Sequence, residues 1–116
     1  MDEFLGVITL ESVVDLAILD SRVTVLKESE VIWTQLVRIP KEDMVDFARD
    51  LASTMCEEFY NHFVNDEILI VVFKERYFTL NKHDHSSWQE MIDYGETVGV
   101  GVEWTTNIPV DETKLL

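Results

Sequence analysis

The chain has 116 residues, of which 47% are apolar and 28% are charged. This is enough for one hydrophobic core, and with only four glycines and two prolines the composition excludes disordered and fibrous proteins. Nine basic against 23 acidic residues give a net charge of −14. We therefore expect a single domain over residues 1–116 and no direct binding of nucleic acid, which requires clustered Lys and Arg.

Three features bear on the compartment. The single cysteine, Cys56, cannot form an internal disulfide, which is typical of a reducing environment. The first residues include acids where a signal peptide has a basic region. The longest uncharged apolar run, residues 68–73, is much shorter than the roughly 20 residues that span a membrane. We expect a cytoplasmic protein without a membrane segment.

The first third of the chain has short patterns. Thr9 is a suitable N-cap for a helix, and alternating apolar residues further on favour strands. We expect residues 1–8 to fray and residues 9–19 to form a helix. Two strands are then expected, at residues 22–27 and 31–39. Pro40 ends the second of these strands and suits the first turn of a helix.

The clearest helical pattern follows Pro40. Met44, Phe47 and Leu51 recur at spacings of three and four, which predicts an amphipathic helix over residues 41–58. Glu42, Asp46 and Asp50 form an acidic row on this helix at i, i+4 spacing.

The middle of the chain predicts a three-stranded meander over residues 59–64, 67–73 and 76–80, with turns at residues 65–66 and near 74–75. Two-residue turns divide its side chains between two faces. One face has Tyr60, His62, Val64, Leu69, Val71, Phe73, Phe78 and Leu80, and the other has Phe63, Ile68, Ile70, Val72, Tyr77 and Thr79. Since both faces are apolar, neither can lie against water.

A final helix is expected to begin after Ser86 or Ser87, each of which starts a capping-box pattern, and to end at Gly99. The polar tail, residues 105–116, is expected to fray. Together these elements predict an α+β fold: one mainly antiparallel sheet of four to five strands with about three helices packed on it.

Two groups of residues have types that could carry chemistry. His83 and His85, at i, i+2 around Asp84, could bind a transition metal, but a third ligand is not identifiable, and we favour a solvated loop in which Asp84 assists the helix cap. Cys56 and His62 are the types of a nucleophile and its base, but the acids next to Cys56 disfavour a thiolate. We expect no catalytic residue, no metal and no cofactor.

A small binding cavity is a further possibility. Trp33, Tyr60, His62 and Trp88 are aromatic residues with polar groups, of the kind that line such cavities. The alternative is an ordinary aromatic core in which His62 is a hydrogen-bonded core or edge residue.

Two further features point to protein partners. The acidic row of Glu42, Asp46 and Asp50 could face a basic protein, although such charge also serves solubility alone. The strand over residues 67–73 is apolar on both faces, and if three helices do not cover it, two-fold pairing into a homodimer would.

The order of patterns along the chain resembles that of a family of small uncharacterised prokaryotic proteins. The shared patterns fall at residues 14–22, 33–40, 60–63, 70–78 and 94–100, so that the resemblance covers about residues 12–104. The usual glycine of the second hairpin and a proline near position 101 are absent here. Because these relatives have no established activity, the resemblance assigns no catalytic residue.

The sequence thus favours a small acidic protein that acts as a non-catalytic protein-interaction module. The alternative is a small-molecule-binding protein or an enzyme with a pocket near Tyr60 and His62.

Overall fold

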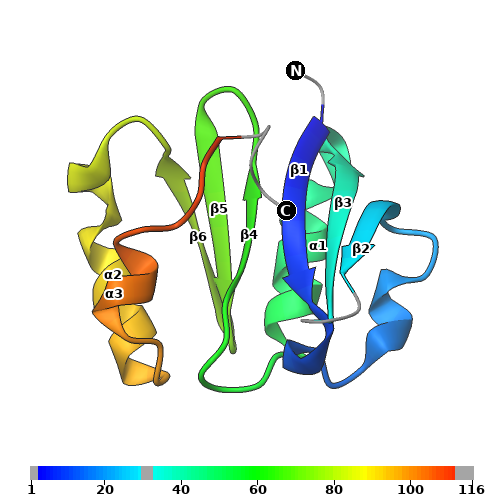
Figure 1. Ribbon diagram of the computed structural model, residues 1–116, viewed down its shortest axis with the longest axis horizontal. Coiled ribbons are helices and arrows are strands. Elements are labelled where there is room, and N and C mark those ends of the chain that lie inside the picture. Colours follow the sequence, from blue (N-terminus) through cyan, green and yellow to red (C-terminus); the bar gives the residue numbers. More distant parts are fainter. Residues whose placement is uncertain (1–2, 30–32, 112–116) are drawn as a thin grey trace.

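The computed structural model describes residues 3–29 and 33–111, which form one antiparallel sheet with helices on both faces (Figure 1). The six strands lie in the order β2-β3-β1-β4-β5-β6. Their bounds are β1 (Glu3–Thr9), β2 (Thr24–Ser29), β3 (Thr34–Pro40), β4 (Asn61–Val64), β5 (Ile68–Phe73) and β6 (Arg76–Asn81). The α-helices are α1 (Met44–Ala52), α2 (Gln89–Thr97) and α3 (Val102–Thr105). The α+β class is confirmed, and the count of four to five strands is wrong.

The additional strand is β1, which lies in the middle of the sheet between β3 and β4. The expectation that residues 1–8 fray is therefore wrong for residues 3–8, and residues 1–2 lie outside the described residues. Phe4 and Ile8 point into the core, and Gly6 lies between them. A Cβ atom at Gly6 would lie 2.1 Å from Cδ1 of Phe63 and 2.7 Å from the carbonyl oxygen of His62. Glycine is needed here because β1 and β4 approach so closely.

The helix expected from Thr9 to Leu19 is not formed. Thr9 is the last residue of β1, paired with Thr34, and two separate 3₁₀ turns follow at Leu10–Ser12 and Leu16–Leu19. The side chain of Asp15 caps the second turn by accepting a hydrogen bond from the N–H of Ala17. Strand pairing has replaced the N-cap that the local pattern suggested.

The two strands expected next are present, with shifted bounds. They are β2 and β3, and residues 31–32 of the second prediction lie outside the described residues.

The amphipathic helix is shorter than predicted. It begins with a 3₁₀ turn at Lys41–Asp43, and α1 ends at Ala52 rather than at residue 58. The following residues leave the helix because they pair with the N-terminal segment. Met55 forms a β-bridge with Val13, and the N–H of Cys56 donates to the carbonyl oxygen of Ser12 at 2.8 Å.

The meander has the predicted strands and the predicted division of side chains. Its first turn lies one residue later than expected, and Val64 is paired with Leu69. The pairing register is therefore shifted by two residues. Because this number is even, every side chain stays on its predicted face of the sheet. Its second turn places Phe73 opposite Arg76. Glu75 takes a φ of 70° in that turn, the left-handed conformation that glycine usually supplies.

The C-terminal region also departs from expectation. Neither Ser86 nor Ser87 caps α2; instead Asp84 accepts from the N–H of Ser86 and caps a 3₁₀ turn that leads into the helix. Gly99, at φ 86°, follows the end of α2 as predicted. Beyond α3 the chain is packed on the sheet: Ile108 is buried, so residues 105–111 do not fray, and residues 112–116 lie outside the described residues.

Two hydrophobic clusters lie on opposite faces of the sheet. The first includes α1 and side chains of β1, β3, β4 and β5, and the second joins β4, β5 and β6 to α2 and to the segment after α3. Figure 1 shows that α1 lies behind β1 and β3, whereas α2 and α3 lie beside β5 and β6. On the face opposite α1, Leu5 and Val7 of β1 are only partly buried. No helix among the described residues has the length and apolar character to span a bilayer.

Candidate functional site

A cavity of about 490 Å³ lies where β1, the approach to β4 and the α2–α3 region meet. Three separate parts of the chain contribute to it, and its walls are largely aromatic and aliphatic. The lining residues are Val7, Thr9, Glu58, Phe59, Tyr60, His62, Val100 and Trp104. A mostly apolar cavity with a few polar groups is the usual form of a small-molecule site.

His62 is the most distinctive residue of this lining. It lies on β4 opposite Val7 of β1, and its side chain is 5% exposed. Its Nε2 atom is buried and has no hydrogen-bond partner in the part of the chain that the structure describes. Burial lowers the pKa of His62 from 6.5 to about 4, although a hydrogen bond to the backbone of Pro109 acts in the opposite direction. Since proline has no N–H, this bond is donated by the ring to a carbonyl oxygen. At neutral pH the imidazole is therefore uncharged.

Tyr60 lies beside His62, with ring centroids 6.0 Å apart. Burial raises the pKa of Tyr60, so its hydroxyl stays protonated at neutral pH. On its other side Tyr60 lies 6.5 Å, between centroids, from Phe73 in the second cluster. The core thus fixes the ring that forms one wall of the cavity.

Glu58 is the only charged residue of the lining within the described residues. It has a φ of 71°, an uncommon conformation for a non-glycine residue, and its N–H donates to the carbonyl oxygen of Val98 at 2.7 Å. Within the described part of the chain, its carboxylate has neither an ion-pair partner nor a hydrogen bond. Strained backbone of this kind is frequent at functional sites.

Trp104, on α3, is 62% exposed although it contributes to the lining. The next residue, Thr105, is fully buried and holds the short helix in place. An exposed tryptophan next to a cavity provides a large apolar surface that a ligand can cover.

Of the four aromatic residues predicted to line one cavity, only Tyr60 and His62 lie together. Trp88 is fully buried in the second cluster, where its Nε1–H donates to the carbonyl oxygen of Asn81 at 2.9 Å. Val7, Glu58 and Trp104 were missed. Val7 belongs to β1, which was not predicted. Glu58 and Trp104 lie in no local sequence pattern that indicates a binding site.

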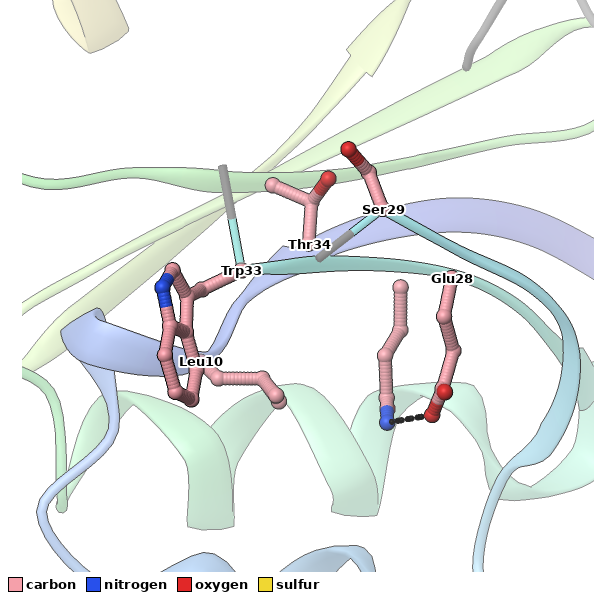
Figure 2. Close-up of a pocket in the computed structure, with 6 residues that line it drawn as sticks. Leu10, Glu28, Ser29, Trp33 and Thr34 are labelled. Carbon is pink, nitrogen blue, oxygen red and sulfur yellow. Dashed lines mark hydrogen bonds between the residues drawn. The ribbon is translucent and has the colours of Figure 1, made fainter. Parts of the chain in front are cut away.

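Trp33 lies at a different hollow, of about 500 Å³, shown in Figure 2. Its backbone carbonyl oxygen accepts from the N–H of Leu10, its side chain is 60% exposed, and its φ is 53°. Glu28 and Gln35, also in the lining, are hydrogen-bonded at 2.9 Å. This hollow adjoins residues 30–32, which lie outside the described residues, so we place no site there.

The other candidate groups have structural contacts. Nε2 of His83 lies 2.9 Å from the carbonyl oxygen of Asp66, and His85 stacks on Trp88 with centroids 4.0 Å apart. Among residues 3–29 and 33–111, no three His, Cys, Asp or Glu side chains are placed to hold a metal ion.

The acidic row of α1 is partly neutralised. Asp46 forms an ion pair with Arg49 at 2.6 Å, and Asp50 forms one with Arg22 at 2.7 Å. Glu42 has no ion pair within the described part of the chain. This pairing reduces the negative charge that a basic partner would meet.

Comparison with known proteins adds no relative. No protein-family model matches the chain, and neither the curated proteins nor the solved structures include a significant match.

Proposed function

We propose that the protein is a non-catalytic binding module that holds a small, largely apolar molecule in the cavity beside His62. The observation that carries the proposal is the buried Nε2 atom of His62, which has no hydrogen-bond partner among the described residues although His62 lines the cavity. Most buried polar groups in proteins are hydrogen-bonded, and an unpaired one costs about 1–3 kcal/mol. A ligand with one hydrogen-bonding group and an apolar body would remove that cost once it displaced the side chains that cover Nε2.

The composition of the lining supports binding rather than covalent chemistry. Among the residues that the structure describes, the lining contains no Cys, Ser or Lys that could act as a nucleophile. The N–H of Thr9 donates to Oδ1 of Asn61, which helps to fix β1 at the cavity edge. Tyr60 and His62 are both neutral at pH 7, which suits hydrogen bonding to an uncharged part of a ligand.

An NMR screen with small aromatic and aliphatic fragments tests this function. We expect saturable shifts at the Trp104 indole and the His62 ring in the wild type. Val7→Phe should abolish these shifts by filling the cavity, whereas Leu5→Phe should retain them because Leu5 lies on the same face of β1 but outside the lining. The proposal is wrong if no fragment shifts these resonances, or if the shifts survive in a folded Val7→Phe variant.

A second candidate is self-association through the edge strand β2. The sequence argument for a homodimer does not apply to β5, because Leu69–Phe73 are buried between helices on both sides. Strand β2 is instead at one edge of the sheet, and Val25 and Leu26 on it are 43% and 46% exposed. Exposed apolar edge strands favour pairing between copies.

Sedimentation analysis distinguishes a monomer from a dimer. We expect a dimer that Val25→Lys converts to a monomer and that Val14→Lys, at an exposed valine away from β2, leaves intact. A single 13.5 kDa species at all concentrations would exclude this candidate.

A further inference from the structure

The charge around the His62 cavity restricts what can bind there. Among residues 3–29 and 33–111, Glu58 is the only charged residue of the lining, and no lysine or arginine contributes to it. Its carboxylate has no partner within the described residues. The chain as a whole has a net charge of −14. The electrostatic fields of the Glu58 carboxylate and of the whole chain therefore repel an anionic ligand and attract a cationic one.

The aromatic residues of the lining favour the same class of ligand. Tyr60 and Trp104 contribute two rings to one cavity, whereas the side chain of Phe59 packs against the first cluster, on the other face of the sheet. The face of an aromatic ring attracts a cation, and several rings together recognise alkylated ammonium groups, whose apolar surface also gains from burial. An unalkylated ammonium group or a metal ion would lose more hydration than these walls replace.

His62 adds a polar contact without adding charge. Its imidazole is neutral at pH 7, so it does not repel a cation, and its buried Nε2 atom can pair with a hydroxyl group on a ligand that displaces the side chains covering it.

We propose that the ligand of this cavity is a small alkylammonium cation that carries a hydroxyl group. Its ammonium lies between Glu58 and the aromatic rings, and its hydroxyl pairs with His62. This inference rests on the proposed function and narrows it to one class of ligand.

Two probes of nearly equal shape test the role of charge: choline and its neutral carbon analogue 3,3-dimethyl-1-butanol. We expect choline to bind at least about tenfold more tightly by calorimetry or NMR titration, with an advantage that shrinks as salt is added. Glu58→Gln should remove most of this advantage.

Glu57→Gln is the matched control, because Glu57 is adjacent in sequence, lies outside the lining and is 3.8 Å from Nζ of Lys74. It should retain the preference for choline. An equal loss in both variants would show that the preference reflects only the overall charge, and would overturn the role of Glu58.

The remaining outcomes separate this inference from the proposed function. If the neutral analogue binds as tightly as choline, or if neutral fragments bind and choline does not, the cation inference is wrong and the cavity remains a binding site. If choline, the analogue and the fragments all fail to bind, both proposals are wrong.

Discussion

The buried histidine should make the stability of the protein depend on pH in a defined window. His62 is neutral in the folded protein because burial lowers its pKa from 6.5 to about 4, and unfolding exposes it to water. Between these two pH values the unfolded chain binds a proton at His62 that the folded chain does not bind. The contribution of His62 is therefore fully present above pH 6.5 and is lost as the pH falls towards 4.

The interval between the two pKa values corresponds to about 3 kcal/mol in the free energy of unfolding. For a domain of this size that is a large part of a typical stability of about 5–15 kcal/mol. The chain also has 23 acidic residues that titrate nearby, so the wild type alone does not isolate His62.

The measurement is urea unfolding of the wild type and of His62→Leu at a series of pH values from 7.5 to 4. We expect the difference in unfolding free energy between them to shift by about 3 kcal/mol against the wild type as the pH falls. Val64→Ala is the control, because Val64 is buried on the same face of β4 and does not titrate, so its cost should stay constant with pH. A constant difference for His62→Leu as well, or an NMR titration of His62 near its ordinary pKa, would refute the reasoning.

Two further predictions concern the strand that the sequence pattern did not reveal. Gly6→Ala should destabilise the protein by about 3 kcal/mol or prevent folding, because its Cβ would clash with Phe63 and with the carbonyl oxygen of His62; a thermal midpoint within a degree or two of the wild type would contradict this. Asn61→Ala should cost about 2–3 kcal/mol in urea unfolding, because the N–H of Thr9 loses its acceptor and Oγ of Ser12 loses the bond that it accepts from Asn61. Asn61→Ser should recover part of that loss, and equal stability of the Ala variant and the wild type would show that the network does not matter.

The meander was predictable because its signals are local. Successive side chains of each strand point to opposite faces of the sheet. This alternation predicts the face of each side chain even though the first turn is displaced by one residue, because both faces are buried. Tyr60 and His62 were predicted to lie together for the same reason, since both fall on one face of one predicted strand, and both line the same cavity.

Strand β1 could not be found in this way. Its even positions, such as Phe4 and Ile8, are buried, but its odd positions include Leu5 and Val7, so the segment lacks the contrast between polar and apolar faces that marks a strand. Its stability comes from pairing with β3 and β4, which are distant in sequence. The same long-range pairing changed Thr9 from an expected helix cap into the end of a strand.

The surroundings of His62 include the last described part of the chain, which the sequence suggested would fray. After α3 the chain runs back over the sheet, where Ile108 is buried and the carbonyl oxygen of Pro109 accepts a hydrogen bond from the ring of His62. This segment thus packs near an imidazole whose Nε2 atom has no hydrogen-bond partner among the described residues. Because β1, β4 and the segment after α3 all contribute to the surroundings of His62, the site exists only in the folded chain. Any ligand that pairs with His62 should therefore stabilise the protein against unfolding in proportion to its binding free energy.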